Sequence, residues 1–343
     1  MKAKIRVLNP VHIGSGQSIS PTGYFIDKDK GHFNFLKMET LFQDPDFSPY
    51  QEEFIREAGL SRYIGNIVRD HNLLKRHVLY SIPASPQARS SNPTEVKEFI
   101  KSAGRPYIPG SSLKGSIISA LFYYALKELW KKPQEKIYID NYLTTKTSPK
   151  NLARNYNQLL EKVYSFLSAQ DKSNFQRTYR QEPSSRSIPS NLGKFANLLD
   201  ISDSTYLDAE SSLKLEYSQV IGGKGKRSIP ILYETLKPNV GLEVNIVRKA
   251  CFLEEKEILE ICHDFYLKVA HHDSPAMVQN LGKHHYVLRL GQGSSAFSTS
   301  FLILAEELHL KGYLVKPPRT RKRLIDGVNQ TSFGYIQLTF GDP

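Results

Sequence analysis

The strongest structural signal in this chain is an apolar stripe that recurs at helical spacing between residues 116 and 130. Its members are Ile117, Ile118, Leu121, Phe122, Ala125, Leu126, Leu129 and Trp130. Lys127, Lys131 and Lys132 lie at its C-terminal end, where the helix dipole favours cations. A stripe of this width is buried against neighbouring elements, so the segment predicts a long helix in a packed core.

Strand patterns occur on both sides of this helix. Residues 2–8 alternate between basic and apolar side chains, which is typical of a strand with one buried face. Further strands are predicted at 24–27, on both sides of a hairpin turn at 237–239, at 286–290 and at 335–340. Further helices are predicted at 151–169, 252–271 and 297–310, and a loop at 81–92. In the last third this order is close to a ferredoxin-like split βαβ arrangement.

The chain is long enough for two domains. It has 343 residues, and we expect each half to hold a ferredoxin-like set of strands and helices with a glycine-rich turn, although no residue-level repeat is present. Residues 144–190 differ in character, with eight Lys or Arg against three acids, and indicate an insertion. We therefore expect the chain to have a fold of the α+β class.

Charge and cysteine content narrow the function classes. A formal net charge of +12 favours a polyanionic partner, most commonly nucleic acid, although a basic surface also serves solubility. The first ten residues lack the apolar region of a secretory signal, and the longest apolar run is too short for a membrane span. Only Cys251 and Cys262 are present, which excludes a disulfide scaffold and a four-cysteine zinc site. We expect no cofactor, no metal and a reducing cytoplasm.

The segment IPGSSLKG, residues 108–115, precedes the long helix. Free backbone N–H groups, the helix dipole and Lys114 together favour phosphate. The alternative is that Ser111 or Ser112 simply caps the helix. A nucleotide triphosphatase is not indicated, because the lysine precedes the second glycine.

Two further glycine turns carry candidate chemistry. Gly291 to Ala296 matches G-x-G-x-x-A between a strand and a helix, but no parallel βαβ unit follows, which favours a turn that approaches a phosphate chain. His12 stands beside the turn Gly14-Ser15-Gly16, where it could be a general base toward a 2′-hydroxyl or a structural histidine.

Two basic segments are expected to be loops. One is GGKGKR, residues 222–227, and the other is residues 311–323, with six Lys or Arg and no acid. Such charges are typical of a solvated loop or of a phosphate contact. His271, His272, Asp273, His284 and His285 fit no metal-ligand spacing, and Asp200, Asp203 and Asp208 fit no calcium loop.

These motifs occur in an order that resembles a known family. VHIGSG, IPGSSLKG, GQGSS and PPRTRKR recur together in CRISPR-associated RAMP proteins, most like the fifth subunit of type III-A Csm effector complexes. LDISDS at 199–204 and ILYETLKP at 231–238 are also similar to segments of that family. One departure is Ile118, where RAMP proteins often carry an arginine.

The resemblance implies two ferredoxin-like, RRM-type domains, the second degenerate, which we place at 1–215, with insertions at about 28–105 and 144–190, and at 216–343. It also implies a subunit that caps the backbone RAMP subunits at the crRNA 3′ end and supports crRNA maturation with a trimming nuclease. We expect a non-catalytic, RNA-binding assembly subunit, because the sequence has several turns suited to phosphate and no catalytic constellation. The alternative is a metal-independent endoribonuclease that uses His12 and Lys114. The residues expected to contact RNA are His12, Gly14, Ser15, Gly16, Ser111, Ser112, Lys114, Gly115, Lys224, Lys226, Arg227, Gly291, Gly293, Ser294, Ser295, Arg319, Arg321, Lys322 and Arg323.

Overall fold

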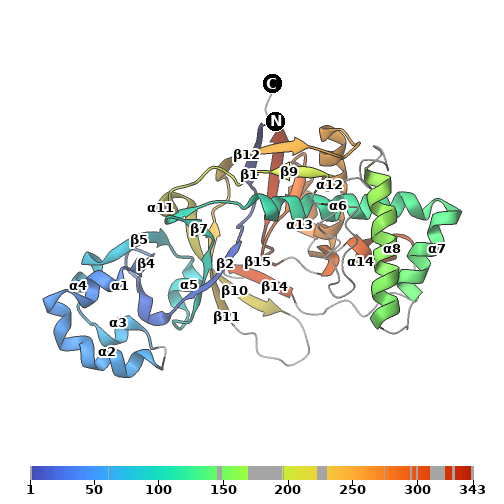
Figure 1. Ribbon diagram of the computed structural model, residues 1–343. Helices are drawn as coiled ribbons and strands as arrows, with labels where there is room; N and C mark the ends of the chain where they lie inside the picture. The colour runs from blue at the N-terminus through green and yellow to red at the C-terminus, as the bar shows by residue number, and fades with distance from the viewer. Residues whose placement is uncertain are drawn as a thin grey trace, which may run out of the picture.

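The structure, a computed structural model, has a mixed α/β architecture with two large sheets and two small ones (Figure 1). It describes residues 2–60, 62–144, 149–168, 195, 197–221, 230–273, 275–293, 296–298, 300–309, 321–326 and 329–340. Six of the residues expected to contact RNA lie outside the described residues: Lys224, Lys226, Arg227, Ser294, Ser295 and Arg319.

The first large sheet has five strands and is built around the predicted N-terminal strand. β1 (Lys2–Val7) pairs antiparallel with β12 (Gly241–Arg248) on one side and with β16 (Tyr335–Phe340) on the other. The edge strands are β9 (Leu199–Ile201) and β13 (Val287–Arg289). Ala3, Ile5 and Val7 are buried as the alternation predicts, and the basic residues of β1 are exposed.

Two long helices supply the apolar cover of this sheet. They are α6 (Gly110–Trp130) and α12 (Glu255–Asp273), and their apolar side chains share one core with β1 (Figure 1). Ile118 is 8% exposed and belongs to that core, so the position where the family often has arginine serves packing here. Cys262 is buried, and burial raises the pKa of its thiol well above the usual range.

The second large sheet has six strands, in the order β15-β14-β10-β11-β6-β2. Their bounds are Asn329–Thr331, Arg321–Asp326, Leu213–Ile221, Pro230–Leu236, Val96–Phe99 and Gly14–Ile19. All neighbours are antiparallel except β6 and β11. Both large sheets take strands from either side of residue 215, so neither is built from one half of the chain.

The turn at Lys237-Pro238-Asn239 is a correction to the sequence prediction. Strands flank it as expected, but β11 pairs with β10 and β6, whereas β12 pairs with β1 and β9. The turn therefore carries the chain from one sheet to the other and does not close a hairpin. Asn239 takes a positive φ of 69°, and its side-chain oxygen accepts a hydrogen bond from Arg6 at 2.8 Å.

Residues 24–83 form a lobe with its own core, drawn in blue at the left of Figure 1. Its sheet consists of β3 (Tyr24–Asp27), β4 (His32–Leu36) and β5 (Val78–Pro83). The loop predicted at 81–92 is wrong, because β5 runs into it and α5 (Pro86–Ser90) follows. The Ser85 hydroxyl accepts from the Ala88 N–H and so caps α5. Short helices complete the lobe: α1 (Met38–Phe42), α2 (Gln51–Ala58), α3 (Ile64–Ile67) and α4 (His71–Arg76).

The remaining helices lie mostly beside α6 and α12. The helix predicted at 151–169 is confirmed as α8 (Pro149–Leu167), and that at 297–310 is shorter, as α14 (Ser300–Glu307). The others are α7 (Pro133–Thr144), α11 (Ala209–Ser212) and α13 (Pro275–Leu281). Within the described residues, no helix has the length and apolar character needed to cross a bilayer.

Candidate functional site

The glycine turn after β13 packs on the segment that precedes β2. The turn predicted at Gly14-Ser15-Gly16 is wrong, because these residues begin β2. Gly291 has a φ of 66°, and the next N–H, of Gln292, donates to the carbonyl of His12 at 2.8 Å. A Cβ atom on Gly291 would lie 2.2 Å from that same carbonyl oxygen. The absence of a side chain at Gly291 therefore allows the turn after β13 to pack directly on the backbone of His12.

A buried arginine holds this junction together. The guanidinium of Arg289 donates to the carbonyls of Gly293 at 2.7 Å and Phe333 at 3.1 Å, and it lies over the ring of Tyr335. Its own carbonyl accepts from the Ser116 hydroxyl of α6 at 2.8 Å. We call residues 10–14, 289–293 and 332–334 the glycine junction. Sequence reasoning missed Arg289, although a cation within the apolar run YVLRL was a usable signal.

The start of α6 corrects the capping prediction. The helix begins at Gly110, with Pro109 as the N-cap residue and no side-chain cap bond, so neither Ser111 nor Ser112 is the cap. The Gly110 N–H donates to a carboxylate oxygen of Asp203 at 2.8 Å. An anion from the chain itself therefore already stabilises the positive end of the helix dipole.

Lys114 also lies near an anion. Its Nζ is 3.9 Å from a carboxylate oxygen of Asp200, which also pairs with Lys249. Lys249 and Lys114 hold the pKa of Asp200 below its usual range. Asp208 instead caps α11, so the three aspartates do not form a cluster. Across the described residues, no group of three or more potential metal ligands is present.

His12 is buried and held in one tautomer. Its Nδ1 lies 2.6 Å from the carbonyl oxygen of Glu234, which only accepts, so Nδ1 carries the proton. The ring packs edge-on against Tyr233 at 4.7 Å. Burial lowers its pKa to about 4, and the charges of nearby lysines act in the same direction, against the backbone hydrogen bond. His12 is therefore neutral at pH 7.

The buried histidine predicts an acid-dependent loss of stability. The unfolded chain binds this proton near pH 6.5 and the native protein only near pH 4, so stability falls as the pH drops through that interval. Between pH 7 and pH 5 we expect the wild type to lose about 2 kcal/mol more than His12→Asn, in which an amide N–H replaces Nδ1. Urea unfolding at the two pH values measures this difference.

The matched control is His71→Asn, because His71 is exposed on α4. We expect this variant to show the pH dependence of the wild type. An equal pH dependence in His12→Asn and in the wild type would contradict the buried, neutral state of His12.

Two lysines flank a tyrosine on one face of the six-stranded sheet. The register places Lys97 of β6 beside Tyr233 of β11, and Lys322 of β14 donates to the Tyr233 hydroxyl at 3.3 Å. Burial and the charge of Lys97 lower the pKa of Lys322. Phe333 of the glycine junction packs edge-on against the same tyrosine at 5.3 Å. We call Lys97, Tyr233 and Lys322 the lysine–tyrosine patch.

The structure also corrects the loop predicted for the second basic segment, residues 311–323. Arg321, Lys322 and Arg323 lie in β14 and not in a loop. Arg323 is 8% exposed and donates to the Ser332 hydroxyl, so neighbouring basic residues have different environments. Lys97 was missed, because a single lysine in the strand VKEF has no sequence signal that sets it apart.

Residues 4–270 match the RAMP superfamily. The chain is 25% identical over 245 residues to CRISPR system Cms protein Csm5 of Methanocaldococcus jannaschii, which covers 64% of this chain and 56% of that relative. It is 29% identical over 132 residues to the Streptococcus thermophilus protein of the same name, covering 35% of this chain and 37% of that relative. The matches thus span about half, or less, of these curated relatives.

Solved structures share the fold along nearly the whole chain. One is a chain of a Csm–crRNA–target RNA ternary complex in a type III-A CRISPR-Cas system, with a TM-score of 0.67 and 22% identity over 98% of this chain and 100% of that one. Another is Csm5 of T. onnurineus, with a TM-score of 0.64 and 21% identity over 97% of this chain and 99% of that one.

Proposed function

Because the chain belongs to the RAMP superfamily, we propose that it is a non-catalytic, RNA-binding assembly subunit of a type III-A CRISPR effector complex. The family match agrees with the resemblance in the sequence motifs. Curated relatives named Csm5 and a structural neighbour from a Csm–crRNA–target RNA complex support the choice of complex. We further propose that it caps the backbone subunits at the crRNA 3′ end, and that a partner nuclease trims the crRNA.

The observation that carries the proposal is the convergence of motifs that are far apart in the sequence. At the glycine junction, hydrogen bonds join the segment around His12, the residues 289–293 and α6. Through Phe333 and His12, the junction contacts Tyr233 of the lysine–tyrosine patch. Close backbone turns beside two lysines suit an RNA backbone that is held through its phosphates.

The strand order supports a ferredoxin-like unit in the five-stranded sheet. Taken as first to fourth strands, β1, β9, β12 and β16 lie in the order 4-1-3-2 with antiparallel neighbours, and α6 and α12 follow the first and third. This is the split βαβ arrangement. A second, degenerate unit and a boundary at residue 215 remain predictions.

The state of His12 supports a non-catalytic role. A pKa of about 4 makes it a weak base at pH 7, and its Nδ1 proton is committed to the Glu234 carbonyl. The contacts of His12 include Glu234, Tyr233, Phe99 and Gln292, and Lys114 lies beside Asp200. The geometry thus favours a structural histidine over a His12–Lys114 pair.

Replacing both lysines of the patch tests the RNA site. We expect Lys97→Ala/Lys322→Ala to bind repeat–spacer RNA roughly ten- to thirtyfold more weakly at 0.1 M salt. The slope of log K against log salt should fall by about 1.4, because each phosphate contact on a single strand contributes about 0.7. Filter binding with the full chain, across a salt series in EDTA, measures both quantities.

The control variant is Lys131→Ala, whose side chain is 62% exposed and pairs with Glu128. It should bind as the wild type does. An unchanged slope in the double variant would reject the patch as the RNA site. RNA recovered from the binding mixture should be intact on a denaturing gel, and cleavage by the wild type in EDTA would instead support the endoribonuclease function.

A further inference from the structure

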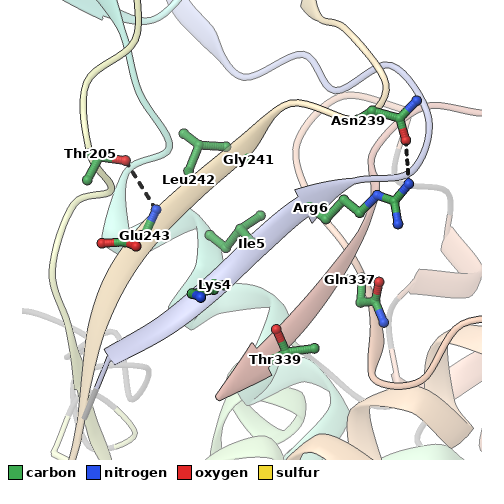
Figure 2. Close-up of a pocket in the computed structure, with 10 residues that line it drawn as sticks. All are labelled: Lys4, Ile5, Arg6, Thr205, Asn239, Gly241, Leu242, Glu243, Gln337 and Thr339. Carbon is green, nitrogen blue, oxygen red and sulfur yellow. Dashed lines mark hydrogen bonds between the residues drawn. The ribbon is translucent and has the colours of Figure 1, made fainter. Parts of the chain in front are cut away.

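The open face of the five-stranded sheet holds a groove that the glycine junction does not use. Figure 2 shows its floor, formed by β1, β12 and β16, with Thr205 and Asn239 at its sides. The groove has a volume of about 510 Å³. A second groove of about 310 Å³ continues past Thr205 and Glu243 to Tyr206. The two hollows together follow the sheet from β16 to the segment 202–206.

Three cations stand in a row on this face. Lys2, Lys4 and Arg6 alternate along β1 with its buried side chains, so successive cations lie about 7 Å apart. Arg6 is held by the Asn239 side chain at 2.8 Å. Lys2 and Lys4 are both exposed. Within the described residues neither forms an ion pair, although Glu243 is the cross-strand neighbour of Lys4. In this part of the chain, an anion can therefore reach both lysines.

An exposed aromatic ring lies at the end of this row. Tyr206 lines the smaller groove and is 45% exposed. Its ring packs against Tyr107 with centroids 5.3 Å apart, and the Arg105 guanidinium lies 5.8 Å from its centroid. The ring is thus supported by its neighbours while a large part of its surface stays in solvent. A supported, exposed ring of this kind is suited to base stacking.

The groove has little that would anchor a protein. Protein interfaces have an apolar or aromatic centre, whereas the apolar groove residues Ile5, Leu242 and Val244 are buried in the core. What remains for a ligand is mainly cations, hydroxyls and amides, the last including Gln337 and Asn239 (Figure 2). Two carboxylates also line the grooves: that of Glu243, and that of Asp203, which accepts from the Gly110 N–H. A row of cations that leads to an exposed aromatic is the combination by which proteins hold single strands.

We propose that this sheet face is a second RNA site that binds a single-stranded segment without reading its sequence. Phosphates lie along Lys2, Lys4 and Arg6, and one base stacks on Tyr206. Amides and hydroxyls of Asn239, Gln337 and Thr339 lie within the groove, where ribose hydroxyls and base edges offer hydrogen-bond partners. The choice of RNA as the polyanion rests on the proposed function, but the site shares no residue with the lysine–tyrosine patch.

The test compares Tyr206→Ala with Tyr206→Phe in the full chain, with labelled single-stranded RNA of mixed sequence. We expect Tyr206→Ala to bind RNA roughly tenfold more weakly than the wild type, or weaker still. Tyr206→Phe keeps the ring and should bind nearly as the wild type does. Lys2→Gln/Lys4→Gln should lower the salt slope by about 1.4. When Lys2→Gln/Lys4→Gln is combined with Lys97→Ala/Lys322→Ala, the losses in log K of the two double variants should add, as they do for separate sites.

The outcomes separate this proposal from the proposed function. If the Tyr206 and Lys2/Lys4 variants bind as the wild type does while the patch variant is weakened, the second site is overturned and the RNA-binding function stands. If no variant is weakened, both fail. If labelled polyglutamate binds the wild type and Lys2→Gln/Lys4→Gln loses that binding, while RNA binding is unchanged in Tyr206→Ala, the face belongs to an acidic protein partner and the RNA site is overturned.

Discussion

Replacing Glu234 with alanine is expected to destabilise the protein by about 3–5 kcal/mol. Its carboxylate is fully buried and accepts hydrogen bonds from the Tyr80 hydroxyl, the Phe99 N–H at 2.9 Å and Lys101 at 2.6 Å. The Lys101 side chain is only 6% exposed. Removing Glu234 leaves that ammonium group buried with far less compensation, which costs more than the hydrogen bonds alone.

Urea unfolding of Glu234→Ala measures this effect, and a paired replacement supplies the control. Glu234→Leu/Lys101→Met removes both charges and keeps side chains of similar size, so it should be clearly more stable than Glu234→Ala. A loss below about 1 kcal/mol in Glu234→Ala would contradict the buried ion pair. The network matters for the site, because β11 carries both Glu234 and the tyrosine of the lysine–tyrosine patch.

Gly291→Ala is expected to lower RNA affinity by roughly tenfold or more and stability by about 2 kcal/mol. Left-handed backbone at φ 66° is unfavourable for alanine. The new Cβ would also lie 2.2 Å from the His12 carbonyl and 3.0 Å from an Ile13 side-chain atom. Because backbone must move to make room, the turn after β13 separates from the segment around His12.

Filter binding and thermal unfolding of Gly291→Ala measure the two parts of this prediction. The matched control is Gly59→Ala, since Gly59 ends α2 with a φ of −61° and has no heavy atom within 4 Å of the new Cβ. We expect Gly59→Ala to bind RNA as the wild type does. Wild-type affinity in Gly291→Ala would show that the junction is not needed for RNA binding.

Local elements were predicted correctly from the sequence where apolar residues recur at a regular helical or strand spacing. The apolar stripe after residue 116 belongs to α6, and the alternation in residues 2–8 is that of β1. The sequence did not predict which strands pair. Strands 230–236 and 241–248 are adjacent in the chain yet belong to different sheets, because their partners are set by contacts with β10 and β1.

In the candidate site, too, the local motifs could be predicted from the sequence but the contacts between them could not. Each glycine motif was visible alone, but no pattern indicated that Gly291 packs on His12 or that Asp203 accepts from the Gly110 N–H at the start of α6. Lys97 had no distinguishing neighbours in the sequence and enters the patch only through the pairing of β6 with β11.

What the sequence by itself determined is the elements with a regular burial period, such as α6 and β1, together with the basic character and the family motifs. These depend on residues close together in the chain. Only the tertiary structure decided the protonation state of His12 and which groups the lysines and arginines contact. The pKa of His12 depends on burial by Tyr233 and Phe99. Lys114 lies within ion-pair distance of Asp200. Desolvation and charge pairing act over a few ångströms between segments that are remote in sequence, so no local pattern encodes them.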